Sequence, residues 1–289
     1  MAQIRSKPFG VTKEGANVTE YILSNPGGLT VSVLDYGCVI KSIIVPAKNG
    51  PVDVVVGHDT MADYEADFNS SGSTCCGAFV GRYANRIENA VFTVGGATYK
   101  LEANNGPNHL HGCFNRKLYR VKSFGDTLLM EAESPDGEDG FPGNLKIAVR
   151  YTLTEDNAFR MDYRVSSDAD TIVNLTNHSY FNLDGGGDVL NQKLRIYASR
   201  YLEGNNQCCP TGAILPVADT PMDFTAGKLI GREIDTGFAQ TTMVGGGYDH
   251  CYVIDRARGS SQSICAWATS DKTGISMKLY TTQPGIQLY

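Results

Sequence analysis

Hydrophobic and polar residues alternate over short stretches through most of this chain, and the alternation predicts β-strands. Residues 29–46 alternate on both sides of a break at Tyr36-Gly37, which indicates two strands or one bent strand. Residues 90–102 form two β-rich runs around Gly95-Gly96, a pair that suits a two-residue hairpin turn. Residues 145–166 repeat this arrangement around a turn. Further strands are predicted at 193–198, 250–254, 263–269 and 275–281.

Helical patterns are few. Residues 59–67 predict one short helix capped by Asp59 or Thr60, and residues 225–234 predict another. The strand–helix alternation of a parallel α/β fold is missing, and no linker or low-complexity segment divides the sequence. We therefore expect an all-β fold in which residues 1–289 form a single antiparallel β domain.

The stretch NLTNHSYFNL, residues 174–183, combines polar and apolar residues in a way that allows two interpretations. It could be a strand with an ordinary polar face to water. It could also be a strand whose polar face lines a wet pocket and carries a proton-transfer residue, His178.

Composition narrows the class of protein. Hydrophobic residues make up 42% and charged residues 19%, which is ordinary for a globular protein, and 32 glycines suit many tight turns. The net charge of −6 and the absence of a basic cluster argue against a nucleic-acid partner. No apolar run is long enough for a membrane span, and the N-terminus lacks the apolar core of a signal peptide. We expect a cytoplasmic protein.

Eight cysteines are present, two adjacent pairs among them, without the C-x-x-C spacing of a zinc site. In an unsecreted chain they are expected to be reduced thiols that act as small core residues.

Five histidines are the first candidates for chemistry. His109 and His111 stand in NGPNHLHG and would face the same way on an extended backbone. The pair is a familiar start for a metal site, but no third or fourth ligand follows at a suitable spacing. Structural histidines and acid–base groups are the two interpretations that this pattern leaves open.

Three other segments carry candidate residues. In GRYANRI, residues 81–87, Arg82 and Arg86 form either a solvated arginine face or a fork that donates hydrogen bonds to hydroxyl or carboxylate oxygens. The acidic SPDGEDGFPGNL, residues 134–145, is expected to be a loop. Asp249 in GGGYDH precedes an apolar strand and is a weak candidate by itself.

Six segments taken in order resemble the aldose 1-epimerase (galactose mutarotase) family: GRYANRI, NHLHG, DGEDGFPG, NLTNHSYFNL, GYDH and TTQPGIQLY. The resemblance covers roughly residues 9–289. It implies a large antiparallel β-sandwich with few short helices and an open sugar cleft. It also implies interconversion of the α and β anomers of an aldohexose such as galactose or glucose, with no metal or other cofactor.

The resemblance also assigns roles. His178 would be the general acid, and His111 would hydrogen-bond near the ring oxygen of the sugar. The side chains that would bind sugar hydroxyls or line the pocket are Asn85, Arg86, Tyr180, Asp249 and Gln283. The remaining histidines have no assigned part, and His58 and His250 are expected to be structural or surface residues. Trp267, in an apolar run, is expected in the core.

One departure concerns the general base, which in the family is a glutamate on a segment beyond the TTQPG strand. This sequence ends at Tyr289 with no matching position, so we expect it to lack the family's last C-terminal strands. Two alternatives stay open: an epimerase for a phosphorylated hexose, which Arg82 and Arg86 allow, and a sugar-binding module without turnover. The sequence does not rank galactose against glucose or indicate the oligomeric state.

Overall fold

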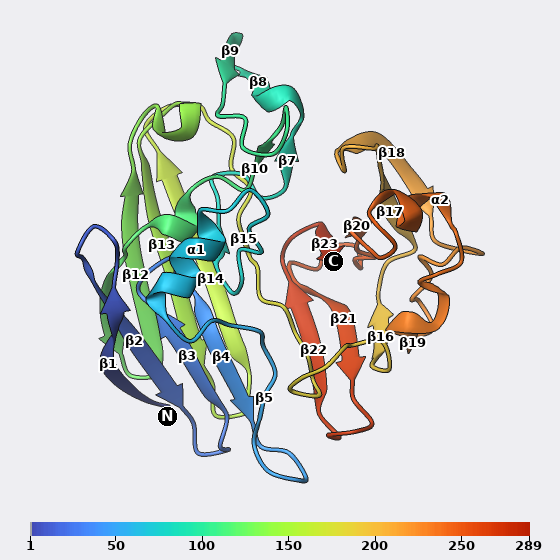
Figure 1. The fold of residues 1–289 in the computed structure, drawn as a ribbon, viewed down its shortest axis with the longest axis horizontal. Helices are drawn as coiled ribbons and strands as arrows, with labels where there is room; N and C mark the ends of the chain where they lie inside the picture. Colours follow the sequence, from blue (N-terminus) through green and yellow to red (C-terminus); the bar gives the residue numbers. More distant parts are fainter. Residues whose placement is uncertain (1) are drawn as a thin grey trace. The chain divides into compact units, whose positions relative to one another are not determined.

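The computed structural model describes residues 2–289, which group into two compact units. Unit 1 comprises residues 2–46 and 51–181, and unit 2 comprises residues 47–50 and 182–289. Strands dominate both units (Figure 1), which confirms the all-β prediction. That residues 1–289 form a single domain stays a prediction.

Two antiparallel sheets build unit 1. The first has five strands in sequential order: β1 (Gln3–Val11), β2 (Asn17–Ser24), β3 (Thr30–Leu34), β4 (Ile40–Val45) and β5 (Val52–Asp53). The second has four strands, also in sequential order: β11 (Arg120–Phe124), β12 (Thr127–Ser134), β13 (Leu145–Leu153) and β14 (Phe159–Ser167). Of the two interpretations of residues 29–46, two strands are confirmed, since the break at Tyr36-Gly37 lies between β3 and β4, and the predicted turn between β13 and β14 is confirmed as well.

The core of unit 1 lies between these sheets, because buried residues of both belong to one apolar cluster. Val31 and Val33 come from β3, and Met130, Val149 and Tyr151 come from β12 and β13. Buried and more exposed residues alternate along β13, so one face of its sheet is apolar. Each such side chain contributes about 1.5–3 kcal/mol to folding, and the arrangement is a β-sandwich.

The predicted helix at 59–67 is α1 (Met61–Phe68). The hydroxyl of Thr60 accepts a hydrogen bond from the Asp63 N–H at 3.2 Å and caps its first turn. Met61, Tyr64 and Phe68 are buried on one face, in a second apolar cluster of unit 1. The apolar spacing of three and four residues therefore explains the helix.

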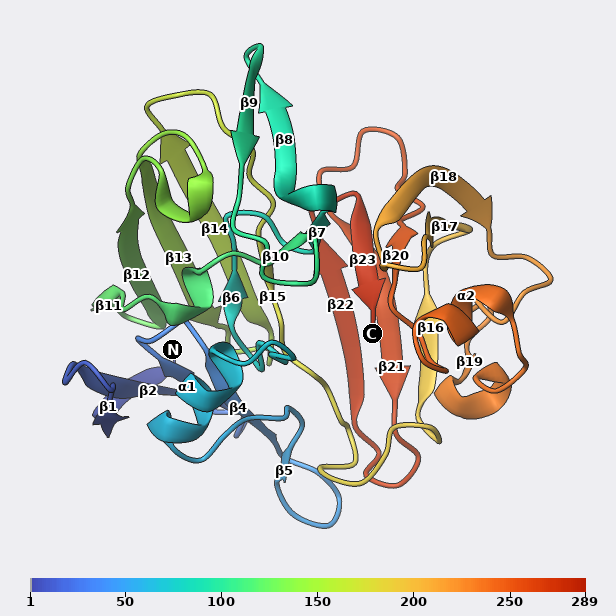
Figure 2. The same cartoon turned by 45° about the horizontal axis from the view of Figure 1, so that its top comes forward.

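Six short strands complete unit 1 and carry most of the candidate residues. The strands β6 (Phe79–Val80) and β15 (Thr176–Asn177) pair, as do β7 (Arg86–Ile87) and β10 (His109–Leu110). The predicted hairpin is β8 (Val91–Val94) and β9 (Ala97–Lys100), with positive φ at Gly95 and Gly96. Figure 2 shows β6, β7 and β10 in cyan to green. Short 3₁₀ turns lie at Glu88–Ala90, Phe114–Arg116 and Glu138–Gly140.

Unit 2 contains two four-stranded antiparallel sheets, ordered β19-β16-β21-β22 and β18-β17-β20-β23. Their strands are β16 (Lys193–Ile196), β17 (Arg200–Gly204), β18 (Pro210–Pro216), β19 (Lys228–Leu229), β20 (His250–Val253), β21 (Ser263–Thr269), β22 (Ser276–Thr281) and β23 (Gly285–Leu288). The four strands predicted for this part of the sequence are thereby confirmed.

The helix predicted at 225–234 is wrong. Gly227 has a φ of 78°, and β19 and a 3₁₀ turn at Ile230–Glu233 follow it. A side chain at Gly231 would meet the Leu190 side chain at 2.8 Å, so glycine is required at this closely packed position. The helix of unit 2 is instead α2 (Ala239–Met243), whose five residues are too few to show an apolar period.

All eight cysteines are free thiols, and five of them are buried: Cys38, Cys75, Cys76, Cys209 and Cys265. Residues 2–289 include no helix with the length and apolar character that a membrane crossing needs.

Candidate active site

The segment that carries His178 is not one strand, which corrects both interpretations of residues 174–183. Only β15 is paired regularly, while Asn174 and Phe181 make isolated bridges to Tyr83 and Val55. Directly after β15, the N–H of His178 donates to the Ala78 carbonyl at 2.8 Å, and its carbonyl accepts from the N–H of Gly77 at 3.0 Å. Main-chain bonds thus hold His178 although it lies outside a regular strand.

His111 follows β10 and leaves the extended conformation, with a φ of 65°. Its ring Nδ1 accepts the N–H of Asn85 at 3.0 Å, and its own N–H donates back to the Asn85 carbonyl at 3.3 Å. Asn85 also has a positive φ, of 69°. Strained backbone of this kind persists only where its surroundings hold it, and it gathers at functional sites.

The bond to Nδ1 decides the form of His111. Because Nδ1 accepts, a neutral ring carries its proton on Nε2 and presents a donor there. Burial lowers the pKa of His111 to about 3, and the nearby His178 and Arg86 contribute to this shift. His111 is therefore neutral at physiological pH and carries its one ring donor on Nε2.

The two histidines lie together. The ring centroids of His111 and His178 are 5.1 Å apart with the planes at 83°, and the rings of His178 and Tyr180 are 5.2 Å apart. All three side chains are half-buried. The structure thus groups three predicted site residues, one directly after β10 and two after β15.

Arg86 lies in β7 beside Asn85. Its Nε donates to the Asn105 Oδ1 at 3.0 Å, and its N–H donates to the Asn85 Oδ1 at 2.8 Å. The guanidinium is therefore oriented by Asn105, a residue that sequence reasoning missed. The only signal was its place in the same NNGPNHLHG stretch as the histidines.

The interpretation of Arg82 as part of a solvated arginine face is wrong, because Arg82 is buried with 1% exposure and forms a fork that donates within the protein. It donates to four oxygens of the acidic loop, namely the Ser134 Oγ and the carbonyls of Ser134, Pro135 and Pro142, at 2.8–3.0 Å. Its fork thus anchors residues 134–142. This removes one of the two arginines on which the hexose-phosphate alternative depended.

His109 and His111 face different ways, which corrects the expectation from an extended backbone. The ring of His109 is buried against Phe141, with centroids 5.3 Å apart, and its Nδ1 lies 2.8 Å from the Glu102 carbonyl. The positive φ of His111 turns the chain between the two side chains. His109 is therefore a packed core residue of unit 1.

In unit 2, Asp249 lies directly before β20. Its Oδ1 accepts from the Nε2 of Gln287 at 2.7 Å. Gln283 is exposed in the turn between β22 and β23. Its main chain is fixed by the Thr281 hydroxyl at 3.0 Å and by Arg256, whose Nη2 donates to the Gln283 carbonyl at 2.7 Å. These two predicted residues belong to a different unit from the histidine pair.

Three residues without an assigned part have the following environments. The Nε2 of His58 lies 3.3 Å from the Asp67 carboxylate, and His250 is buried, so both are structural as predicted. Trp267 is not in the core, which corrects that prediction. It lies half-exposed on β21 and donates to the Ser276 hydroxyl at 2.7 Å.

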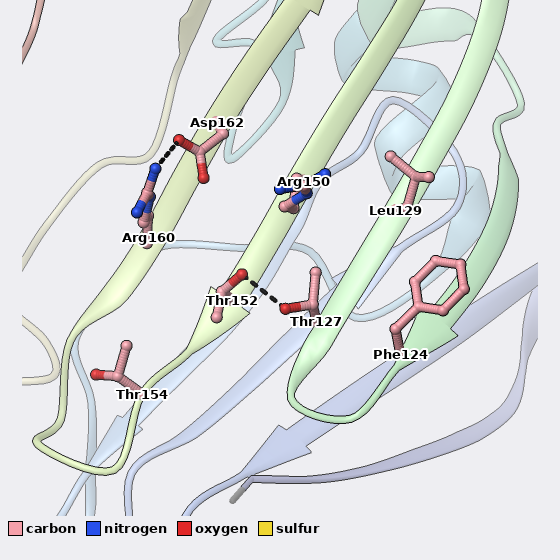
Figure 3. A pocket seen from close by; sticks show the side chains of 8 residues that line it. All are labelled: Phe124, Thr127, Leu129, Arg150, Thr152, Thr154, Arg160 and Asp162. Carbon is pink, nitrogen blue, oxygen red and sulfur yellow. Dashed lines mark hydrogen bonds and ion pairs between the residues drawn. The ribbon is translucent and has the colours of Figure 1, made fainter.

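An open hollow on the outer face of the β11–β14 sheet lies away from the predicted residues (Figure 3). It is lined by Phe124, Thr127, Leu129, Arg150, Thr152, Thr154, Arg160 and Asp162. Arg160 is paired with Asp162 at 2.7 Å, and Thr127 with Thr152 at 2.9 Å. Thr127 and Thr152 are a cross-strand pair of β12 and β13, and Arg160 and Asp162 are neighbours on the same face of β14, as on an ordinary solvated sheet face.

Comparison with known proteins agrees with this geometry. A family model described as aldose 1-epimerase matches residues 19–289. The chain belongs to the aldose 1-epimerase family. The aldose 1-epimerase of Haemophilus influenzae is 35% identical over 96% of this chain and 79% of its own, and the galactose mutarotase of Sus scrofa is 34% identical over 100% and 82%.

Two crystal structures share the fold of this family. Galactose 1-epimerase from Lactobacillus acidophilus superposes with a TM-score of 0.82 at 26% identity, covering 94% of this chain and 78% of its own. An aldose epimerase homologue from C. elegans superposes with a TM-score of 0.81 at 30% identity, covering 99% and 82%. The aldose 1-epimerase family consists of isomerases, and its mutarotase-like β fold is the fold of this chain.

Proposed function

We propose that the protein interconverts the α and β anomers of an aldohexose, galactose or glucose, by acid–base catalysed ring opening. The observation that carries this proposal is the histidine pair of unit 1, in which His178 lies 5.1 Å from a His111 ring whose Nδ1 accepts the Asn85 N–H. One ring can transfer a proton while its neighbour is held as a fixed donor.

In this mechanism His178 delivers a proton to the ring oxygen of the sugar while a base removes the proton of the C1 hydroxyl. The bond between C1 and the ring oxygen breaks and leaves an open-chain aldehyde. The Nε2–H of His111 stabilises the ring oxygen as its bonding changes. Rotation about the C1–C2 bond and closure give the other anomer, and such proton transfers each contribute about 10²–10⁴-fold to the rate.

The sugar-binding residues in the proposal are Asn85, Arg86, Tyr180, Asp249 and Gln283. Amide, guanidinium and carboxylate groups suit hydroxyls, which both donate and accept hydrogen bonds. Arg86 is supported by its fixed orientation on Asn85 and Asn105. The base is left unassigned, since no glutamate of these 289 residues stands in the motif that the family resemblance implies.

A cytoplasmic location belongs to the same proposal, because eight free thiols suit a reducing compartment. The substrate is a small sugar.

The test is the optical rotation of freshly dissolved α-galactose with the full-length protein. We expect the rotation to reach equilibrium much faster than in buffer, and His178→Ala to lose about 10²-fold or more of this acceleration with an unchanged unfolding temperature. His58→Ala is the matched control and should keep its rate. A wild-type protein that leaves the decay at the buffer rate would contradict the proposal.

A further inference from the structure

Asp249 is held by the side chains of two neighbouring residues, His250 and Gln287, to which the proposed function assigns no contact with the sugar. Its main-chain N–H donates to the Nδ1 of His250 at 3.2 Å, and its carboxylate Oδ1 accepts from the Nε2 of Gln287 at 2.7 Å. Gln287 lies in β23 and pairs with Cys251 of β20, the residue that follows His250. One neighbour thus fixes the main chain of Asp249 and the other its carboxylate.

The ring of His250 is fixed in turn by Gln240. The Gln240 Oε1 accepts from the Gly204 N–H at 2.9 Å, and its Nε2 donates to the Gly204 carbonyl at 3.2 Å. These two bonds set which end of the amide is oxygen. That oxygen lies 3.1 Å from the Nε2 of His250, so Nε2 must carry the proton.

The contacts of the two ring nitrogens of His250 therefore indicate the same protonation state. A neutral imidazole with its proton on Nε2 leaves Nδ1 as an acceptor for the Asp249 N–H. His250 is buried with 2% exposure, and its ring lies edge-on to Tyr201 with centroids 5.7 Å apart. Burial lowers the pKa of His250, which favours the same neutral form although the charge of Asp249 opposes the shift.

Resting on the proposed function, in which Asp249 binds a sugar hydroxyl, we propose that His250 and Gln287 are the positioning residues of Asp249. Neither needs to touch the sugar. His250 sets where the Asp249 main chain enters β20, and Gln287 sets the plane of the carboxylate. Pre-orientation of this kind lowers the cost of ordering the carboxylate when the hydroxyl binds. It should therefore act on KM for the sugar more than on kcat.

A matched pair of substitutions separates positioning from packing. In His250→Asn, the Oδ1 occupies nearly the place of Nδ1 and keeps an acceptor for the Asp249 N–H. In His250→Gln, the longer side chain keeps a group near Gln240 but loses that acceptor. Both variants should lower the unfolding temperature, whereas we expect KM for galactose to rise about 5- to 20-fold in His250→Gln and less than about 3-fold in His250→Asn. Equal KM changes in the two variants would overturn the role of His250.

Gln287 allows a test that does not disturb the core, because its side chain is exposed. Gln287→Met keeps the size of the side chain and removes the donor to Asp249, and we expect KM to rise about 3- to 10-fold with kcat within about 2-fold. Gln262→Met is the control, since Gln262 is also exposed and precedes β21, which belongs to a different sheet from β20 and β23. An unchanged KM in Gln287→Met would overturn the role of Gln287.

A double-mutant cycle shows whether the effect passes through Asp249. His250→Gln and Gln287→Met should each raise KM in the wild-type background and leave it unchanged in the Asp249→Ala background. Effects that persist without Asp249 would contradict the proposal.

Failure of the proposed function can be distinguished from failure of the positioning role. If the wild-type protein showed no mutarotation, the ¹⁵N resonances of His250 would still report whether Nδ1 is an acceptor and Nε2 a donor. The Asp249 amide resonance should shift in His250→Gln and stay close to wild type in His250→Asn. A protonated Nδ1 at neutral pH would refute the positioning contact, whatever the activity.

Discussion

Two pairs of residues in this protein share one contact, a main-chain N–H that donates to the Nδ1 of a neutral histidine. Asn85 donates to His111 in unit 1, and Asp249 donates to His250 in unit 2. In each pair the histidine is kept unprotonated by burial. A ring in this state fixes a backbone position without adding charge beside a neutral sugar.

The depressed pKa of His111 predicts a pH dependence of stability. The native ring stays neutral down to about pH 3, while the unfolded ring takes up a proton below its ordinary pKa of 6.5. Stability from this group is therefore complete above pH 6.5 and is lost as the pH falls toward 3. His111→Asn keeps an acceptor for Asn85 but does not titrate.

Urea unfolding at pH 7.5 and pH 4.5 measures this difference. Between the two values the wild-type protein should lose about 1–3 kcal/mol more of its unfolding free energy than His111→Asn does, after allowance for the partial exposure of the ring. Parallel losses in the two proteins would mean that His111 is protonated in the native state.

Arg82 gives the second prediction at this scale. Arg82→Lys should lower the free energy of unfolding by about 2–4 kcal/mol, because an ammonium group cannot reach all four oxygens of the 134–142 loop and leaves buried carbonyls unpaired. Arg160→Lys, on the solvated face of β14, should cost less than about 0.5 kcal/mol. Equal losses by chemical denaturation would refute the anchoring role.

Elements formed by neighbouring residues could be predicted from the sequence. Strands β8 and β9, and likewise β13 and β14, pair across turns of a few residues, so alternation and turn chemistry are sufficient. The segment 174–183 could not be predicted in this way. Its partner β6 lies about a hundred residues earlier, and pairing over that distance leaves no local pattern.

The candidate site likewise contains residues that the sequence indicated and partners that only the structure reveals. The order of its motifs indicated the family and with it His111, His178, Asn85 and Arg86, and the structure brings these four together. The partners Asn105 and Gln287 and the burial of Arg82 depend on how loops fold back, which spacing does not reveal.

Close packing at the end of β10 gives a prediction at the scale of the element. A side chain at Gly112 would lie 2.4 Å from the Gly81 carbonyl oxygen, and φ there is 75°. Gly106 has a φ of 59° but open space around it. Gly106→Ala thus carries the conformational cost alone, about 1 kcal/mol, whereas Gly112→Ala should cost about 3 kcal/mol or more and lower activity by displacing His111.

The unfolding temperature and the mutarotation rate of Gly106→Ala and Gly112→Ala test this prediction. Similar losses of stability would show that the segment of Gly112 moves away from Gly81 at little cost.

At the scale of the whole molecule, the reactivity of the eight thiols distinguishes the folded protein from the unfolded one. Five are buried, and burial raises the pKa of Cys113 and of Cys251 among the partly exposed three. A thiol reagent at pH 8 should therefore modify Cys208 first in the native protein and all eight thiols after unfolding in urea.

Cys208→Ser should remove the fast phase of this reaction and keep the other phases. A native protein that reacts rapidly at four or more thiols would contradict the burial of the five buried side chains.

The way Arg82 holds the 134–142 loop has a consequence for protein engineering. Three of its four contacts are with carbonyl oxygens, which every amino acid provides. The anchor therefore recognises the course of the chain and is nearly indifferent to the identity of the residues it holds. Substitutions in the loop should therefore leave these three contacts in place, although the side chain of Asp136 makes a contact of its own, because its Oδ1 accepts the N–H of Gly143 at 2.6 Å.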